Sequence, residues 1–241
     1  MRTLRQAVAA MLVAAVLLVL VLTAIAGARQ HPQDVPWTKL DLGDPVGMFT
    51  ARKLTALTSD LPQCRALLGR AGVRYALLPP VQEGRCGYAD GVTFRSGGAR
   101  RAVYRPTLGT SCAVAASLAL WEWQTVQPEA RTLLGSPVVG IDHLGSYNCR
   151  RIGSGEGGNW SEHATADAVD IAGFVLADGR RISVLEDWRG TGPEATFLHR
   201  VRNGACRLFA TTLSPDYNAA HANHFHLDQA TRGGMGWTVC R

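Results

Sequence analysis

The longest hydrophobic stretch of the chain lies at its N-terminus, where residues 7–26 contain no charged side chain. This run of about 20 residues has the length that an α-helix needs to cross a bilayer. It exceeds the hydrophobic core of an ordinary signal peptide, about 7–15 residues, so we expect an uncleaved signal anchor. Small residues at Ala24, Ala26 and Ala28 could still form a cleavage site. The arginines before the run keep the N-terminus in the cytoplasm, which places the rest of the chain outside.

After this run the hydrophobic pattern becomes weak and then mixed. Residues 29–53 contain prolines and polar residues with little periodicity, which predicts a linker. We therefore divide the chain into a transmembrane segment at residues 1–28, a linker at 29–53 and one globular domain at 54–241. A domain of that length can bury a substantial hydrophobic core.

Short helices and strands are mixed along the domain. Hydrophobic residues at helical spacing predict helices over residues 61–69, 112–127 and 194–203. Ser111 is the expected N-cap of the second helix. Apolar runs bounded by turn residues predict strands at residues 75–78, 91–95, 137–141, 168–176, 181–185 and 224–228. The short connections favour an α+β fold, with a small antiparallel sheet and flanking helices.

The chain is basic, with 25 Lys and Arg against 19 Asp and Glu and a formal net charge of +6. A basic surface could attract nucleic acid, anionic lipid or an acidic polymer. The positive residues are mostly arginines that are scattered along the chain, and no run alternates them with aromatic residues. We therefore expect no nucleic-acid partner, and an anionic cell-wall polymer is compatible with the charge.

The cysteines agree with an exported protein. They are even in number, dispersed and without a CxxC pair: Cys64, Cys86, Cys112, Cys149, Cys206 and Cys240. This pattern favours disulfides over a thiolate zinc site, which lacks its ligand spacing here. Sequence does not determine the pairing. We expect Cys64–Cys86 and Cys206–Cys240, which leaves Cys112–Cys149.

Histidines and one aspartate form the main candidate for chemistry. His221, His224 and His226 crowd into HANHFH, and His163 precedes Asp170 in SEHATADAVDI. Two imidazoles and one carboxylate suit a catalytic zinc site, in which the fourth position is left to water. Bound water then has a lowered pKa and becomes a nucleophile near neutral pH. On a strand, alternate residues share a face, so His224 and His226 can reach one site.

These motifs resemble those of known families. SEHATADAVDI followed by HFHLD is similar to the S-x-H-x-x-G-x-A-x-D … H-x-H pattern of zinc D-Ala-D-Ala peptidases and murein endopeptidases. More closely, the stretch from about residue 61 to the C-terminus resembles the bacterial extensin-like protein C-terminal family. GSYNCR, WSEHATADAVDIAGF and PDYNAAHANHFHLD carry that resemblance. It implies a fold like that of the D-Ala-D-Ala metallopeptidases and peptidoglycan as the substrate.

The resemblance also assigns roles to single residues. It implies that His163, Asp170 and His226 are the zinc ligands. Ser161 occupies the serine position of the motif, where its hydroxyl would brace the site. Arg150 falls where the peptidases have an arginine, and its guanidinium could stabilise a developing oxyanion or form only a surface salt bridge.

Two positions depart from the peptidase pattern. Ala166 replaces the motif glycine, which is a mild change if the backbone angle allows it. Asn223 stands where the dipeptidases have a glutamate, and an amide cannot act as a general base. His221 and His224 match the additional histidines of murein endopeptidases, so His224 is our candidate base. Glu162 or Asp187 could substitute for it.

Together these observations predict a monomeric, zinc-dependent peptidase that acts on peptidoglycan stem peptides or cross-links. We expect it to be anchored in the inner membrane by its N-terminal helix, with the domain in the periplasm, or to be secreted if the helix is cleaved. Asn223 motivates an alternative, a non-catalytic peptidoglycan-binding or scaffold protein on the same fold.

Overall fold

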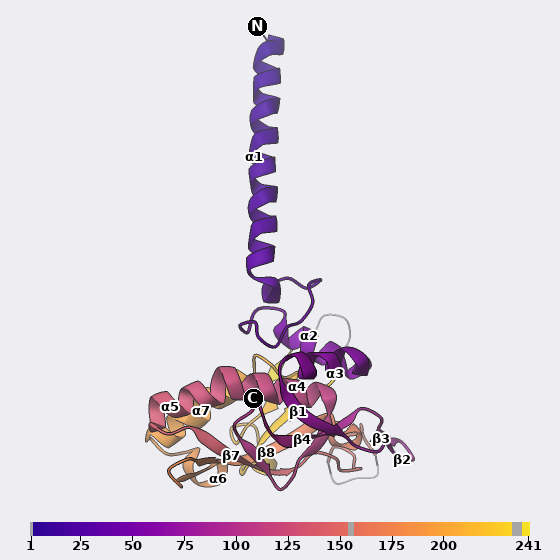
Figure 1. The fold of residues 1–241 in the computed structure, drawn as a ribbon, viewed down its shortest axis with the longest axis vertical. Coiled ribbons are helices and arrows are strands. Elements are labelled where there is room, and N and C mark those ends of the chain that lie inside the picture. Colours follow the sequence, from indigo (N-terminus) through magenta and orange to yellow (C-terminus); the bar gives the residue numbers. More distant parts are fainter. Residues whose placement is uncertain (1, 154–156, 233–237) are drawn as a thin grey trace.

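The N-terminal apolar run forms one long helix that stands away from the rest of the molecule. The computed structural model describes residues 2–153, 157–232 and 238–241. Helix α1 (Arg2–Gln30) projects from the globular part, and none of its residues is buried (Figure 1). Its length and composition suit a membrane span or a signal sequence. Such a continuous apolar surface is unfavourable in water, which agrees with either of these roles.

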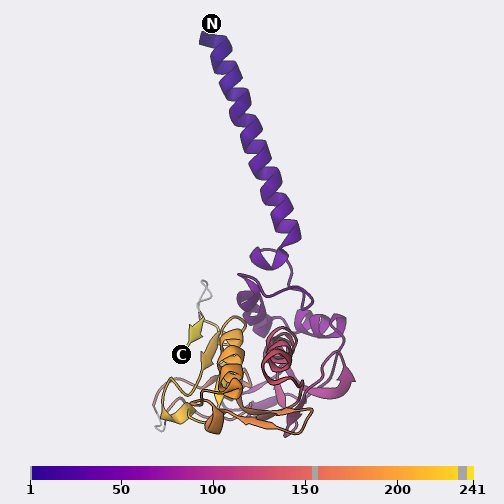
Figure 2. The same ribbon diagram turned by 90° about the vertical axis from the view of Figure 1, so that its left-hand side faces the viewer.

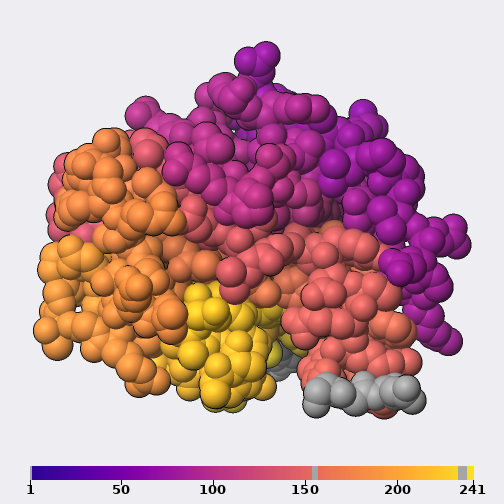
Figure 3. Space-filling view, turned by 90° about the horizontal axis from the view of Figure 1, so that it is seen from below, coloured from indigo at the N-terminus to yellow at the C-terminus, as the bar shows by residue number. Residues whose placement is uncertain are grey.

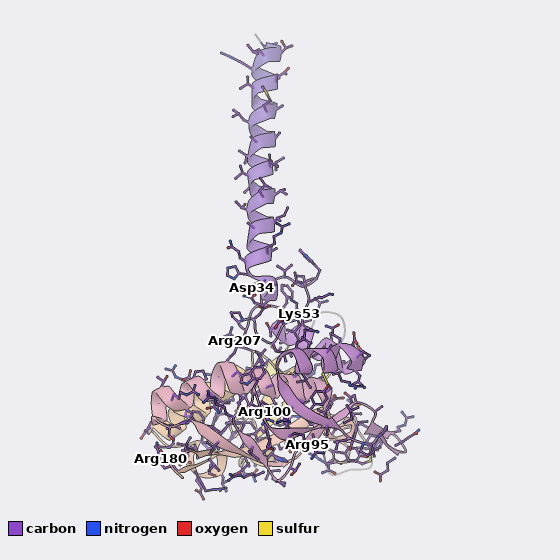
Figure 4. All side chains as sticks on the ribbon, viewed as in Figure 1. Asp34, Lys53, Arg95, Arg100, Arg180 and Arg207 are labelled. Atoms are coloured by element: carbon purple, nitrogen blue, oxygen red, sulfur yellow. A yellow bond between two sulfur atoms is a disulfide. The ribbon has the colours of Figure 1, made fainter. Side chains whose placement is uncertain are left out.

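The segment after α1 is packed against the domain. Residues 31–49, which we call the collar, contain the 3-10 turn η1 (Pro32–Asp34), and the collar residues Leu40 and Leu42 are buried in the core. Lys53 donates hydrogen bonds of 2.9 and 2.8 Å to the collar. Figure 4 shows Asp34 and Lys53 close together at the foot of α1. The domain boundary at residue 54 stays a prediction, but the segment before it is folded.

A central mixed sheet carries the functional residues. In the described part of the chain it has seven strands in the order β12-β10-β11-β8-β7-β5, with β9 also paired to β8. Its strands are β5 (Val103–Arg105), β7 (Val138–Gly145), β8 (Ala168–Leu176), β9 (Arg181–Ser183), β10 (Thr211–Leu213), β11 (Phe225–Asp228) and β12 (Val239–Cys240). The central pairings β10–β11, β11–β8 and β8–β7 are antiparallel, as is β8–β9. The outer pairings β10–β12 and β5–β7 are parallel, so the expected antiparallel sheet is mixed at its edges.

The remaining strands of the described residues form two smaller sheets. One is antiparallel with the order β1-β4-β6, and the other is the hairpin β2-β3. Their strands are β1 (Val73–Leu77), β4 (Gly91–Gly98), β6 (Gly109–Ser111), β2 (Val81–Glu83) and β3 (Cys86–Tyr88). The mixture of these sheets with helices is an α+β fold.

Most of the helices lie above the central sheet when α1 points upward, whereas the short α6 lies at the lower edge of the domain (Figures 1 and 2). Their bounds are α2 (Thr50–Ala56), η2 (Leu57–Ser59), α3 (Leu61–Arg70), α4 (Cys112–Trp121), α5 (Gln127–Leu134), α6 (Val184–Asp187) and α7 (Pro193–Ala205). Ser111 caps α4 as expected, because its side chain accepts a hydrogen bond from Val114 N. The expected helix over residues 112–127 is longer, since the π-helical turn η3 (Glu122–Val126) joins α4 to α5.

Helix α4 is the centre of the hydrophobic core. All of its residues are buried, as two apolar faces in its sequence indicate. Trp121 packs against Phe174 of β8, and its indole Nε1 donates a hydrogen bond of 2.8 Å to the carbonyl of Val201 in α7. Phe174 in turn meets Phe197 edge to face. These contacts place α4 and α7 against one face of the central sheet. The side chains of Asp170 and His226 lie on the opposite face.

All six cysteines form disulfides, and two of the three expected pairings are wrong. The bonds are Cys64–Cys112, Cys86–Cys149 and Cys206–Cys240. The first joins α3 to the start of α4, two helices that pack against each other, and the second joins the β2-β3 hairpin to the loop after β7. The packing of segments that are distant in sequence, which no local pattern shows, determines the partners of both bonds. The third pair is as expected.

Candidate metal centre

Asp170 and His226 face each other across two neighbouring strands. They are paired residues of β8 and β11, and His226 Nδ1 lies 3.0 Å from Asp170 Oδ1. Phe225 and Leu227, the chain neighbours of His226, are fully buried in the core. The alternation of side chains along a strand thus places the polar pair on one face and the core residues on the other.

His163 approaches the pair from the 3-10 turn η4 (Glu162–Thr165). Its Nε2 lies 3.2 Å from Asp170 Oδ1 and 3.1 Å from His226 Nδ1. The His163 side chain is almost fully enclosed, with 3% of its surface exposed. This buried group of two histidines and one aspartate could hold a metal ion.

The separations of the three atoms match those around zinc. Ligands on a tetrahedral zinc with bonds of about 2.0–2.1 Å stand about 3.3 Å apart. The corresponding distances here are 3.0, 3.1 and 3.2 Å. A donor set of two imidazole nitrogens and one carboxylate oxygen is also one that zinc accepts. The residues therefore fit a zinc ion that keeps an open fourth position.

Hydrogen bonds from the backbone orient His163. Its Nδ1 lies 2.6 Å from the carbonyl of Ser146, so in this tautomer Nδ1–H donates and Nε2 is free to bind a metal. The Ser146 hydroxyl donates to the carbonyl of Ala168 at 2.6 Å, which fixes the loop after β7 against β8. Ser161 caps η4, because its hydroxyl accepts a hydrogen bond from His163 N at 3.3 Å.

The turn that carries His163 ends in a left-handed residue. Ala166 has φ of 60° and ψ of 16°, and it is fully buried. Among the described residues it is the one non-glycine residue with positive φ. This is the position at which the peptidase pattern has glycine, so the backbone keeps the turn although the residue differs.

A second carboxylate, that of Asp228, contacts the ring nitrogen of His226 that faces away from Asp170. Asp228 Oδ2 lies 3.1 Å from His226 Nε2, and Asp228 itself is 3% exposed. A metal-binding histidine commonly donates its other N–H to such a carboxylate, which fixes the ring. Asp228 and Ser146 are functional residues that the sequence motifs did not indicate. For Asp228 a signal was present, because a residue two positions after His226 on a strand shares its face.

Hydrogen bonds among the site residues shift the pKa values of His226 and Asp170 in opposite directions. Burial works against protonation of His226, but hydrogen bonds to Asp170 and Asp228 outweigh it and raise its pKa to about 9. Burial likewise works against ionisation of Asp170, but hydrogen bonds from His163 and His226 hold its pKa well below the usual range. The aspartate is thus kept as an anion at the point where the three ligand atoms converge.

His224 lies beside this group on the same face. Its Nδ1 is 2.8 Å from Asn223 Oδ1, and its Nε2 is 3.5 Å from Asp170 Oδ1. Burial lowers the pKa of His224, which favours the neutral ring. Asn223 can therefore hold the proton on Nδ1 and leave the Nε2 lone pair directed toward the site.

His221 and Arg150 form the outer part of the cluster. The His221 ring lies 5.1 Å from that of His224, and its Nδ1 is 2.7 Å from Asn218 Oδ1. Burial, helped by the charge of His224, lowers the pKa of His221 to about 4. Arg150 is exposed, and its charge contributes to the lowered pKa of both histidines. The backbone carbonyl of Arg150 accepts a hydrogen bond from Ser161 N, which links it to the turn of His163.

Glu162 and Asp187, the two alternatives to His224 as general base, lie in different parts of the domain. Glu162 is next to His163, and burial together with the charges of Asp228 and Asp167 raises its pKa to about 6. Asp187 accepts a hydrogen bond of 2.7 Å from Ser183 N at the start of α6. Glu162 is therefore the one that lies within electrostatic reach of the metal ligands.

The site lies toward the end of the domain opposite α1. Figure 3 views that end, and the C-terminal segment (yellow) and the segment around residue 150 (salmon) lie next to each other there. These segments supply HANHFH and Arg150. The site is thus built where two chain segments meet on the face that points away from the N-terminal helix.

Comparison with known proteins identifies the family. A family model described as "Extensin-like protein C-terminus" matches residues 62–241. Comparisons with curated proteins and with solved structures gave no match. The match covers about three quarters of the chain and includes the whole histidine cluster, so the chain belongs to the extensin-like C-terminal family.

Proposed function

We propose that the protein is a zinc-dependent peptidase of the cell envelope that cleaves peptidoglycan stem peptides or cross-links. The observation that carries this proposal is the convergence of His163 Nε2, Asp170 Oδ1 and His226 Nδ1 within 3.2 Å of one another. The order of these residues follows the motif of zinc D-Ala-D-Ala peptidases and murein endopeptidases. A metallopeptidase fold of that kind is part of the proposal.

The surrounding side chains suit peptide hydrolysis. When bound, zinc would supply a Lewis acid with an open coordination position. His224 Nε2 would accept a proton and pass it to the leaving amine, while Asn223 holds its ring. Arg150 would stabilise negative charge that develops on the scissile carbonyl. His221 lies behind His224 and would limit its movement.

The location of the protein agrees with a wall substrate. The N-terminal apolar helix and the three disulfides suggest an extracytoplasmic location. We propose that α1 remains as an anchor in the inner membrane and that the domain works in the periplasm as a monomer, or that the domain is secreted if α1 is cleaved. Peptidoglycan is the polymer that such a domain would meet.

A second candidate function is favoured by one residue. Asn223 occupies the place of the glutamate base in the dipeptidases, and an amide does not accept a proton. A protein that binds peptidoglycan through the same face without cutting it, or that serves as a scaffold, would tolerate this exchange.

Release of fragments from purified sacculi distinguishes the two functions. The full-length protein in detergent would be incubated with sacculi and zinc, and soluble fragments would be identified by mass. We expect release by the wild type and by His31→Ala, an exposed control histidine, and no release by His163→Ala. Release by His163→Ala at the wild-type rate would contradict the metal-dependent mechanism, and co-sedimentation without release by any variant would favour the binding protein.

Metal content tests the site separately from activity. We expect one zinc per chain in the wild type and its loss in His226→Ala. A wild-type protein that takes up no zinc, with its disulfides formed, would contradict the zinc proposal whatever its effect on sacculi.

A further inference from the structure

Two large hydrophobic side chains of the collar face outward. Trp37 is 81% exposed and Met48 is 78% exposed. Within the part of the chain that the structure describes, no other large hydrophobic residue is exposed to this extent, even on α1. The collar residues Leu40 and Leu42, in contrast, are buried in the core. One pair of hydrophobic side chains therefore holds the collar to the domain, and the other pair is left uncovered.

The backbone around Trp37 is held by a lysine from outside the collar. Lys53 Nζ donates a hydrogen bond of 2.9 Å to the carbonyl of Pro32 and one of 2.8 Å to Thr38 Oγ1. The Thr38 hydroxyl donates to the carbonyl of Val35 at 2.9 Å. These bonds hold the chain on both sides of Trp37, so the exposed indole is presented by an ordered turn.

Met48 is brought to the same end of the domain, beside η1. Its N–H donates a hydrogen bond of 2.7 Å to Asp34 Oδ1, and Phe49 N–H donates one of 3.1 Å to the carbonyl of Gln33. Gly47 allows this approach, because a Cβ atom there would overlap the Gln33 side chain and the Asp34 carboxylate. Figure 4 shows Asp34 at the foot of α1. The backbone of Met48 is therefore fixed next to that foot.

The collar begins close to the end of the apolar run. The run ends at residue 26, α1 continues to Gln30, and η1 starts at Pro32. At the rise of an α-helix, the distance from residue 26 to Pro32 is about 9 Å. The headgroup layer on each side of a hydrocarbon core is about 5–8 Å thick. If α1 spans a bilayer, the collar therefore starts at the surface of the headgroup layer, within reach of a side chain as long as tryptophan.

Charges in this part of the chain nearly balance. Residues 29–53 carry four positive side chains and three carboxylates, namely Arg29, Lys39, Arg52 and Lys53 against Asp34, Asp41 and Asp44. A surface of mixed charge attracts a polyanion only weakly. Exposed apolar side chains are then the feature that a partner would recognise.

We propose that Trp37 and Met48 contact the headgroup region of the bilayer that α1 spans, and that this contact docks the domain on the membrane. The inference rests on the proposed retention of α1 as an anchor and adds a second contact with lipid. Tryptophan is enriched at membrane interfaces, because its indole combines an apolar body with one N–H donor. Methionine is flexible and adapts to irregular apolar surroundings. The collar is continuous with α1, so lipid lies beside it wherever α1 is inserted, which favours lipid over a second copy of the chain.

Tryptophan fluorescence in brominated lipid tests this contact, because bromine quenches an indole that touches it. Helix α1 contains no tryptophan, so the inserted helix gives no signal. The full-length protein would be reconstituted in phosphatidylcholine vesicles with or without bromine on the upper part of the acyl chains. The test variant is Trp37→Phe. The matched control is Trp160→Phe, because Trp160 pairs with Arg151 in the segment around residue 150, at the end of the domain opposite α1 (Figure 3).

We expect bromine to quench the wild type and Trp160→Phe to the same extent, and most of this quenching to be lost in Trp37→Phe. Uncharged phosphatidylcholine should suffice, because the contact is apolar. Equal quenching of the wild type and Trp37→Phe would overturn the proposal.

A second pair of variants tests the part of Met48. Met48→Glu places a charge in the contact, so it should reduce the quenching of Trp37. Leu185→Glu makes the same kind of exchange at a residue of α6 that is 60% exposed, and it should leave the quenching unchanged. Equal quenching in these two variants would remove Met48 from the contact.

An alkaline wash of the vesicles separates failure of the anchor from failure of the docking contact, because it removes proteins without a membrane span. Loss of the wild type in the wash would contradict the anchor and the lipid contact together. Retention with an unquenched Trp37 would contradict the lipid contact alone. Trp37 emission that is insensitive to bromine but shifts with the density of protein in the vesicles would overturn the proposal in favour of a second copy of the chain.

Discussion

Asp228 Oδ2 lies 3.1 Å from Nε2 of His226, on the side of the imidazole away from Asp170 and His163. The carboxylate therefore fixes which ring nitrogen is free for a metal. We expect Asp228→Asn to weaken zinc affinity about 10–100-fold, because such orienting partners contribute that much in other metal sites. Competition with a chelator of known affinity measures the change.

Asp41→Asn is the control for this experiment, because Asp41 is exposed in the collar far from the histidines in sequence. Its zinc affinity should equal that of the wild type. An Asp228→Asn protein that also kept wild-type affinity would show that Asp228 does not act through His226.

His224 is expected to serve the reaction and not the metal. Its Nε2 is 3.5 Å from Asp170 Oδ1, farther than the three candidate ligand atoms are from one another. We expect His224→Gln to retain zinc and to lose about 10²–10⁴-fold in the rate of fragment release, the usual contribution of a general acid–base group. Metal content and release rate would be measured on the same preparation. Loss of zinc together with activity would instead make His224 a ligand.

The disulfide pairing can be checked by mapping linked peptides from an unreduced digest. We expect peptides that contain Cys64 and Cys112 to be joined, and likewise those with Cys86 and Cys149. Linked peptides with Cys64 and Cys86 would contradict the structure.

The three bonds should also differ in their resistance to reducing agents. Cys64 and Cys112 are fully buried, whereas Cys149 and Cys240 are exposed, so a mild reductant should open the Cys64–Cys112 bond last. Replacing Cys64 and Cys112 by alanine should lower the free energy of unfolding by about 4 kcal/mol, from the entropy of the loop that the bond closes. Urea unfolding of the oxidised proteins measures this.

Asp167 makes stability depend on pH. Burial raises its pKa from an ordinary value of 3.8 to about 6, although hydrogen bonds from Ser111 and Thr165 act in the opposite direction. The folded state therefore holds the proton more tightly than the unfolded chain. Its contribution to stability is present at low pH and is lost as pH rises from about 4 to 6.

Asp167→Asn should remove this part of the profile. Its free energy of unfolding should fall less between pH 4 and pH 6 than that of the wild type, by up to about 3 kcal/mol. Urea unfolding at each pH gives the comparison, with Asp41→Asn as an exposed control. Parallel profiles for wild type and Asp167→Asn would show that Asp167 titrates normally in the folded protein.

Local patterns predicted the elements that carry the site. The apolar run at residues 168–176 forms β8 with those bounds, and Ser111 caps α4. Alternation along the strand placed Asp170 and His226 on one face, because side-chain direction in a strand follows from the backbone. The expected strand at residues 181–185 ends earlier, at Ser183, where the helical turn α6 begins.

What the sequence did not predict depends on contacts between distant segments. Disulfide partners follow the packing of α3 on α4 and of the β2-β3 hairpin on the loop after β7, and neither packing has a local pattern. The carbonyl of Ser146 orients His163, and because every residue has a backbone carbonyl, no residue type could reveal that contact.

The collar at residues 31–49 determines how far from the membrane the protein can work. A flexible tether of that length would let the domain wander by about 25 Å. Here Lys53 donates a hydrogen bond to the collar carbonyl of Pro32, and Arg207 in the domain donates one of 2.8 Å to the collar carbonyl of Val46. If α1 remains in a bilayer, these bonds shorten the free tether between the membrane and the domain. The domain would then explore a thinner zone beside the membrane than a fully flexible tether would allow.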